Sequence, residues 1–331
     1  MLRYLRTYWF LICLAVVLIV SHWGSSQLRF LADEPRLRSG IVFSVMFLMA
    51  LPVPLRHVGD SLRKPGPSLL AIAINQLGLP LMAYFVSRWL TAELGGGLIV
   101  SSVIPCTLAS AAVMVRKAGG NDTIPVMVTL ITTLFCFLVT PAWLWLFLAK
   151  TVHLDGWQTA WNLGWEVLFP IVLAQVVALI APVGSWAQKY KNWLGTICQM
   201  GILAMVAIGS IQLGNRGDLN RATGALVWVG VAAAGIHLAA LTLGWFMAAG
   251  LGWDRSTRIG VALASSQKTL MVGLKIAVDA GVSMVPIVAY HILQLVIDAA
   301  LVETWGKGSK ATNLAVSKDV HAQAENAEKD R

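Results

Sequence analysis

The sequence predicts an all-α membrane protein with ten transmembrane helices. They form two five-helix inverted repeats with two broken, crossing helices, the fourth and the ninth. Composition supports the class, because 57% of the 331 residues are hydrophobic and 12% are charged, with a mean hydropathy of +0.71. A soluble domain carries about 25% charged residues. Ten apolar runs support the span count, and short matches between the halves support the repeat.

Nine runs contain no Asp, Glu, Lys or Arg, and all but one approach or exceed the roughly 20 residues that cross a bilayer core. They are 7–28, 39–55, 65–87, 94–115, 123–149, 167–188, 192–215, 222–253 and 280–297. The short one, 39–55, is still within the usual tolerance for a span. A tenth run, 259–275, is apolar apart from a polar centre that contains Lys268.

Ten spans place both termini on one side of the membrane. Most of the 25 lysines and arginines fall in the terminal segments and loops of that side, so the positive-inside rule predicts cytoplasmic termini. We expect an integral protein of a bacterial inner or plasma membrane. Basic residues occur singly and in pairs, so the net charge of +9 predicts contact with the lipid bilayer and not with nucleic acid. The expected segments are a first repeat over 1–155, a second over 156–305, and a disordered cytoplasmic tail over 306–331.

The repeat is predicted from two pairs of short matches. Leu-Ala-Ser occurs at 108–110 in the fourth run and at 263–265 in the ninth. Ile-Pro-Val at 124–126 and Val-Pro-Ile at 285–287 open the runs that follow. Matches this short also arise by chance in an apolar chain. Because five is odd, the second half enters from the opposite side, as in the inverted repeats of secondary transporters, whose interrupted helices cross at the midplane.

Two polar stretches mark the expected breaks. Residues 101–107 combine a proline with serines, a cysteine and a threonine, and residues 265–269 read Ser-Ser-Gln-Lys-Thr. Hydroxyls in a span also serve ordinary helix packing, which is the simpler interpretation of the first stretch. A lysine at mid-bilayer depth costs about 3 kcal/mol or more and is seldom found there without a use. The second stretch therefore predicts a functional site.

Other classes of function lack support in the sequence. Cys13, Cys106, Cys136 and Cys198 lie inside apolar runs, without a CxxC or Cys/His pattern, and are typical of small core residues. There is no metal-ligand cluster, intramembrane protease motif or nucleotide-binding loop. We expect a protein that is not an enzyme, holds no resident cofactor and is not driven by ATP.

Three motifs resemble a known family. Residues 105–122, with Val-Thr-Pro at 139–141, resemble the fourth and fifth helices of the bile acid:sodium symporter family. The stretches 265–269 and 290–295 resemble its SBF-like branch more closely. The resemblance covers all ten spans and implies a panel domain and a core domain. It also implies sodium-coupled import of a small organic anion by alternating access, with sodium as the coupling ion.

The sodium ligands implied by the resemblance are only partly present. Ser110, Thr129 and Gln267 match ligand positions, and either Asn75 or Gln76 matches a third-helix glutamine. An alanine, Ala111, stands where an asparagine is expected, and Pro125 stands where a serine is. The glutamate shared by both sodium sites falls on Leu263, and the asparagine after the glutamine falls on Lys268. Two-sodium coupling is therefore not implied by these residues.

The missing carboxylate and the added lysine suggest one hypothesis. Lys268, among Ser265, Ser266 and Gln267, occupies or competes for a cation position. Coupling would then use a proton at Lys268, fewer sodium ions, or no ion. The alternative is that Lys268 is a structural ammonium, paired with Asp298 or with a carbonyl group. If Asp298 does not pair with Lys268, we expect it to be solvated.

Further residues are assigned by position. Asn121 and Asp122 lie in a tight inner turn and are candidates for touching a coupling ion. Candidates to line the substrate cavity are Thr107, Thr269, His291 and Gln294. Lys275 and Asp279 are expected to pair near the end of the ninth helix, and His237 has no partner that the sequence reveals.

Two classes of function remain. The first is a monomeric secondary transporter of an organic anion. The second is a non-transporting membrane component that regulates ion entry or envelope assembly.

Overall fold

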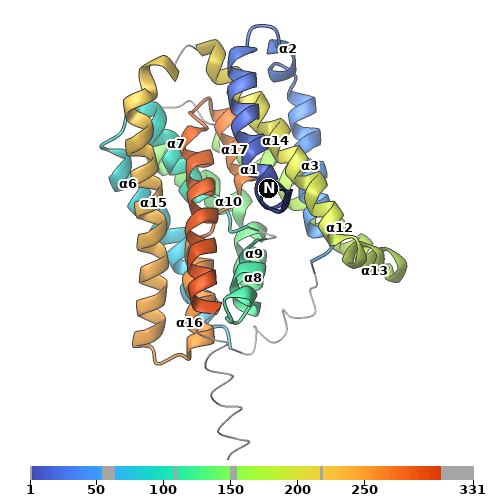
Figure 1. The fold of residues 1–331 in the computed structure, drawn as a ribbon, viewed down its shortest axis with the longest axis vertical. Helices are drawn as coiled ribbons and strands as arrows, with labels where there is room; N and C mark the ends of the chain where they lie inside the picture. Colours follow the sequence, from blue (N-terminus) through green and yellow to red (C-terminus); the bar gives the residue numbers. More distant parts are fainter. Residues whose placement is uncertain (1, 54–63, 108–109, 150–154, 217–218, 307–331) are drawn as a thin grey trace, which may run out of the picture.

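The computed structural model describes residues 2–53, 64–107, 110–149, 155–216 and 219–306 (Figure 1). Within these residues every regular element is a helix. The elements are α1 (Leu2–Trp23), α2 (Arg29–Ala32), α3 (Pro35–Ala50), α5 (Gly66–Ala73), η2 (Ile74–Gly78), α6 (Leu79–Ser87), α7 (Ala92–Val103), α8 (Ser110–Lys117), α9 (Thr123–Leu134), α10 (Cys136–Leu148), α11 (Gly156–Leu163), η3 (Gly164–Leu168), α12 (Phe169–Ala178), α13 (Ala181–Lys189), α14 (Lys191–Arg216), α15 (Leu219–Gly250), α16 (Arg255–Ser266), α17 (Leu270–Ala280) and a last helix, Val285–Gly306.

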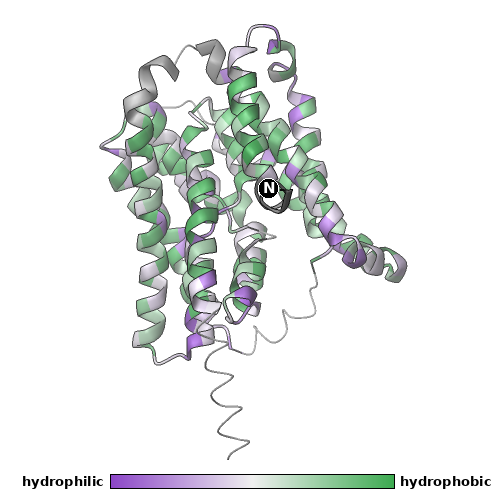
Figure 2. Ribbon diagram, viewed as in Figure 1, coloured by the Kyte–Doolittle hydropathy of each residue, from purple (hydrophilic) through white to green (hydrophobic). Residues whose placement is uncertain are grey.

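The protein is an all-α membrane protein. Six helical stretches of the described chain are long and apolar enough to cross a bilayer, or seven if the pair α9–α10, bent by 69°, counts as one. Hydrophobic residues extend over the length of the bundle (Figure 2), and many large apolar side chains are exposed. Exposed tryptophans such as Trp23, Trp89 and Trp157 lie at helix ends, as interfacial anchors do. The predicted tail falls almost wholly in 307–331, and Leu108 and Ala109 of the repeat motif also lie outside the described residues.

The helices pack as two groups. In the first group α1, α3, α12 and α14 pack on one another, with α11 and α13 at its edges. The second group contains α5 to α10, α15 to α17 and the last helix. Figure 1 shows the first group on the right and the second on the left. The groups meet mainly through α17 and α10, which contact α14, α3, α11 and η3.

The paired helices α16 and α17 form the centre of the bundle. Every residue in the most apolar window of this span is buried, whereas the other five single spans are less than half buried. Of the predicted core cysteines, Cys106, Cys136 and Cys198 are buried and Cys13 is half-buried, and all four are free thiols. The prediction of core residues is confirmed for the three buried cysteines, whereas Cys13 lies outside the core.

Helix ends follow from local signals. Asp155 caps α11 by accepting from the backbone N–H of Trp157 at 2.9 Å, and Asp254 caps α16 by accepting from Ser256 at 3.0 Å. A hydrogen bond from the Thr257 hydroxyl, above all, lowers the pKa of the Asp254 carboxyl. At its other end α17 stops at Gly281, whose φ of 66° is left-handed and suits glycine.

Two prolines create π-helical turns within long helices. Pro80 and Pro170 are each the second residue of the α-helix that follows a five-residue π segment. In the first, the N–H of Leu79 bonds to Ile74 O, five residues back. The carbonyl of Asn75 then has no helical partner, because the residue five ahead is Pro80, which has no N–H. The freed carbonyl is available to another part of the chain.

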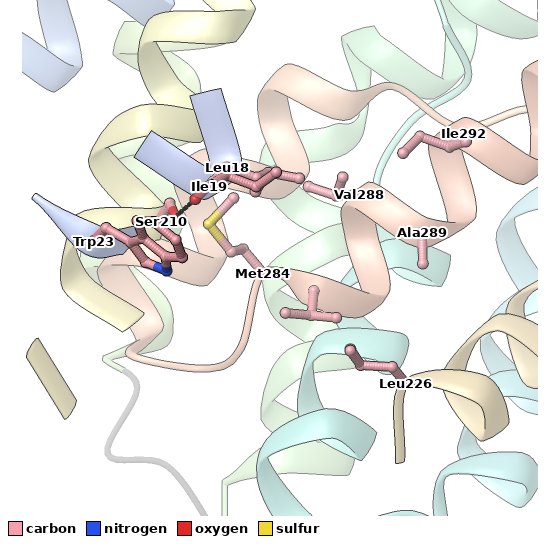
Figure 3. Close-up of a pocket in the computed structure, with 10 residues that line it drawn as sticks. Leu18, Ile19, Trp23, Ser210, Leu226, Met284, Val288, Ala289 and Ile292 are labelled. Atoms are coloured by element: carbon pink, nitrogen blue, oxygen red, sulfur yellow. Dashed lines mark hydrogen bonds between the residues drawn. The ribbon is translucent and has the colours of Figure 1, made fainter. Parts of the chain in front are cut away.

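A cavity of about 640 Å³ lies between the groups (Figure 3). Leu18, Ile19 and Trp23 of α1 line one side, and Val288, Ala289 and Ile292 of the last helix line another. The hydroxyl of Ser210 on α14 donates to Leu18 O at 3.0 Å and so adds little polarity. This part of the group interface is apolar.

Close packing of α7 on the last helix can be tested at Gly97. An added Cβ would overlap the carbonyl oxygen of Ser283 and lie 2.9 Å from Pro286 Cδ. We expect Gly97→Ala to destabilise the folded protein by about 1–3 kcal/mol, measured as a lower unfolding temperature in detergent. The control is Gly235→Ala on α15, where nothing lies within 4 Å. Equal unfolding temperatures for the two variants would contradict this packing.

Candidate functional site

Both predicted polar stretches interrupt helices, and the two interruptions touch. α7 ends at Val103, after which Ile104 is extended with ψ of 161°, and α8 begins at Ser110. α16 ends at Ser266. The backbone is then extended at Gln267 and Thr269, and α17 begins at Leu270. The backbone N–H of Thr269 donates to Pro105 O at 3.1 Å. The two stretches therefore meet backbone to backbone, and we call this place the crossing (residues 103–107 and 264–269).

Side chains from neighbouring helices satisfy the broken backbone of the first stretch. The Thr140 hydroxyl donates to Val103 O at 2.8 Å, and the Thr129 hydroxyl donates to Thr107 O at 2.8 Å. The N–H of Cys106 donates to the Thr132 hydroxyl at 3.1 Å. Within a bilayer no water is available for these groups, so each one needs a partner from the protein. α9 and α10 supply them.

The second stretch is satisfied in the same way from two other helices. The amide of Asn75 donates to the carbonyls of Ala264 and Gln267 at 3.0 Å each and to that of Ser265 at 3.3 Å. On the last helix, the Tyr290 hydroxyl donates to Ser266 O at 2.6 Å. Gln294 accepts from the N–H of Lys268 at 2.7 Å and donates to its carbonyl at 3.4 Å. The last turn of α16 is thereby capped by side chains.

Lys268 joins the two stretches to the π turn. Its side chain is almost fully buried, at 2% exposure, and its Nζ donates to Ile104 O and to Asn75 O at 2.8 Å each. The first acceptor is the carbonyl that α7 leaves free where it ends. The second is the carbonyl that the π turn and Pro80 leave free. Of the alternatives predicted for a structural ammonium, pairing with carbonyls is the one observed.

Asp298 has partners other than the one expected. Its carboxylate accepts from the Gln267 amide at 2.7 Å and lies 3.0 Å from His237 Nε2. Both Asp298 and His237 are fully buried, so the solvated alternative is wrong as well. The pairing with Lys268 fails because the lysine extends toward η2 and the α7 break, whereas Asp298 meets α15 and Gln267. His237, which had no visible partner in the sequence, is thus part of the site.

The side chains of four predicted site residues bond within their own local structure. Ser265 donates to Val261 O at 2.7 Å, and Ser266 donates to Leu263 O at 3.3 Å, both within α16. Asn121 Oδ1 accepts from the backbone N–H and the hydroxyl of Thr123, and the Asp122 carboxylate accepts from Arg116 Nε at 2.7 Å, at the turn between α8 and α9. These residues hold their local structure.

The expected sodium ligands divide into a set that retains free oxygens and a set that does not. Ser110 Oγ is 3.2 Å from Thr107 Oγ1 and 3.5 Å from Gln267 Oε1, contacts that are long for hydrogen bonds. These neutral oxygens, next to Thr129, fit a single weak cation position. At the carbonyls of residues 264–267, by contrast, Asn75 and Tyr290 already donate. Leu263, in place of the shared glutamate, is fully buried in an apolar cluster.

Sequence reasoning found one donor that completes the crossing and missed two others. Asn75 and Gln76 were both candidates, and the structure uses the Asn75 amide as the cap, while Gln76 donates to Asn75 Oδ1 at 3.0 Å. The spacing of Asn75 to Pro80 was the available signal. Thr140 and Tyr290 lay within motifs that carried the resemblance, but neither was assigned a role. His291, one turn before Gln294, is partly exposed.

Comparisons with known proteins agree with this architecture. The model of the SBF-like CPA transporter family matches residues 8–307. An uncharacterized sodium-dependent transporter of Bacillus subtilis, YocS, is 25% identical over 283 residues, 82% of this chain and 86% of that protein. The probable sodium/metabolite cotransporter BASS4 of Arabidopsis thaliana is 26% identical over 242 residues, 68% and 55% of the two chains.

A third relative is the sodium/bile acid cotransporter 7 of Xenopus tropicalis, 22% identical over 228 residues, 66% of this chain and 65% of that protein. The family resemblance stated from three motifs is thus confirmed over most of the chain. With its two broken helices meeting at a buried lysine, the chain belongs to the SBF-like CPA transporter family, and it is a membrane transporter, not an enzyme.

Proposed function

We propose that this chain is a secondary transporter of a small organic anion that works by alternating access. Lys268 takes one cation position of the crossing, and a single sodium ion binds beside Ser110. The observation that carries the proposal is the pair of 2.8 Å hydrogen bonds from Lys268 Nζ to Asn75 O and Ile104 O. They place a tethered cation among carbonyls that broken helices leave free, which is where transporters of this plan hold coupling ions.

The electrostatics of the crossing favour an anionic substrate. α8 and α17 both begin at the crossing, so their N-termini direct partial positive charge toward it. Lys268 adds a full positive charge, and its two hydrogen-bond acceptors are neutral carbonyls. The buried carboxylate nearby, Asp298, is already bound by His237 and Gln267. The C-termini of α7 and α16 also end here and offset these dipoles, so the attraction for an organic anion entering beside Thr107 or Thr269 rests on Lys268.

The oxygen ligands at the crossing support binding of fewer than two sodium ions. A second sodium at the ninth-helix carbonyls would have to displace the Asn75 amide from three oxygens. Hard cations such as sodium favour charged oxygen ligands, and Leu263 supplies none. The oxygens of Ser110, Thr107 and Gln267 remain for one ion, which is consistent with the sodium dependence named for the Bacillus subtilis relative.

Uptake into proteoliposomes tests the function directly. We expect a panel of organic anions to include one whose uptake depends on an imposed sodium gradient with a Hill coefficient of about one, because a single ion binds. Liposomes without protein and an imposed proton gradient without sodium are the controls. A proton-driven flux would assign coupling to Lys268 instead. No flux of any anion under either gradient, with no ligand-dependent thermal stabilisation, would favour the non-transporting regulator.

Replacing Lys268 tests its place as a tethered cation. Lys268→Ala leaves Asn75 O without its donor, at about 1–3 kcal/mol, and leaves Ile104 O with only a 3.4 Å contact from the Gln76 amide. We expect a lower unfolding temperature, at least tenfold slower uptake (about 1.4 kcal/mol), and partial recovery of the unfolding temperature with added sodium, which can enter the vacated position. Lys191→Ala, at an exposed lysine of α14, is the matched control. Unchanged uptake and ion dependence in Lys268→Ala would exclude this role.

The position of the single sodium is tested with two serines. Ser110→Ala removes an oxygen from the predicted site, and we expect the sodium concentration for half-maximal uptake to rise by about tenfold, or about 1.4 kcal/mol. Ser265→Ala is the control, because that hydroxyl bonds within α16 to Val261 O. A larger effect at Ser265 than at Ser110 would place the ion elsewhere.

A further inference from the structure

A second buried charged cluster lies away from the crossing, toward the other end of α17. Lys275 Nζ is 3.0 Å from Glu166 Oε2, and their side chains are only 6% and 11% exposed. Lys275 also pairs with Asp279, one turn on, as the sequence predicts. The other oxygen of Glu166 accepts from the Ser39 hydroxyl at 2.7 Å. Glu166 itself was not among the residues singled out in the sequence.

This ion pair joins the two helix groups. Ser39 is on α3 and Glu166 is in the π turn η3, both in the first group, whereas Lys275 and Asp279 are on α17 in the second. Polar contacts between the groups are few here, since α17 otherwise packs through apolar residues such as Ile276 and Leu274. A buried charge pair is costly to break when either charge is left alone. The contact therefore holds the groups together at this level.

Each charge keeps a partner in its own group when the pair is broken. Lys275 retains Asp279 on the same helix, and Glu166 retains the Ser39 hydroxyl. Lys275 keeps a counter-charge and Glu166 keeps one hydrogen bond, so separation costs less than it does for a buried pair with no other partners. An arrangement of this kind favours the closed contact and still lets it open reversibly.

A polar cavity of about 190 Å³ leads to the ion pair from the end of the bundle where α11 begins and α17 ends. Gln158, Thr159 and Asn162 of α11 line one wall, and Lys275 and Asp279 line the other. Leu163 lies at the same cavity and is buried, at 2% exposure. Water can thus reach one side of Lys275, while the pair with Glu166 closes the space between the groups.

We propose that the Glu166–Lys275 ion pair is a latch that closes the polar cavity between the two helix groups and opens when they move apart. The proposal rests on the proposed alternating-access transport, in which such a movement exposes the interface on one side at a time. The closed latch is the state in this structure.

The latch is tested by the reactivity of a cysteine placed at a buried position of the polar cavity. Leu163→Cys is introduced into the full-length chain, purified in detergent, and labelled with a water-soluble maleimide without substrate. The labelling rate of Leu163→Cys alone is the rate for the closed latch. The labelling rate of the unmodified chain gives the background from the four native thiols. We expect Glu166→Gln and Lys275→Met each to speed labelling by about tenfold or more, because the open state is more populated.

Two variants control for nonspecific effects. Asp33→Asn removes the exposed Arg29–Asp33 pair on α2 and should leave the labelling rate unchanged. Glu166→Lys with Lys275→Glu keeps one cation and two carboxylates in the cluster and should return the rate toward the closed value. Unfolding temperatures show whether each protein is folded. If only one of Glu166→Gln and Lys275→Met folds, the labelling rate of that variant decides whether the latch proposal holds.

The proposal is overturned if neither single variant speeds labelling, if Asp33→Asn speeds it equally, or if the exchanged pair fails to slow it again. The labelling needs no flux, so it separates the two ideas. Faster labelling without transport of any anion would support the latch and contradict the proposed anion transport. Transport of an anion with unchanged labelling would support the proposed function and contradict the latch.

Discussion

The structure depends on satisfying a backbone that two broken helices leave unpaired inside the membrane. Lys268 makes the central contribution, since its ammonium bonds at once to the π turn at Asn75 and to the end of α7 at Ile104. No single helix could provide these acceptors. Pro80 frees one carbonyl and the extended Ile104 frees the other, so the lysine is tolerable at this depth only because both irregularities meet there.

The same constraint explains why so many polar side chains of the second group point inward. Threonines of α9 and α10 serve the first broken stretch, and Asn75, Tyr290 and Gln294 serve the second. Such a fully bonded crossing is expected to move as a unit, because separating any part of it exposes several partners together. Between the groups, by contrast, the described residues meet through apolar surfaces and the Glu166–Lys275 ion pair. The weaker boundary is therefore the group interface, and not the crossing.

The sequence predicted the features that depend on local chemistry. The all-α membrane class, the family and the two polar interruptions all follow from composition and from runs of residues along one helix. The partner of Asp298 could not be predicted, because it depends on how α15 and the last helix are rotated toward α16. The role of Asn75 required knowing that Pro80 produces a π turn, and Glu166 meets Lys275 only through the packing of three helices distant in sequence. The ten-span inverted repeat remains a prediction.

A tethered cation changes what the coupling site can do in the proposed mechanism. A sodium ion that dissociates on each side carries the energy of its gradient into the cycle, whereas the charge of Lys268 stays with the protein throughout. Its positive charge can help to hold an anion at the crossing, but if Lys268 keeps its proton through the cycle it contributes no driving force. The gradient must then act through the neutral oxygens at Ser110, Thr107 and Gln267. A chain with a lysine at the crossing and a leucine at 263 therefore keeps electrostatic attraction for the substrate while using fewer coupling ions per turnover.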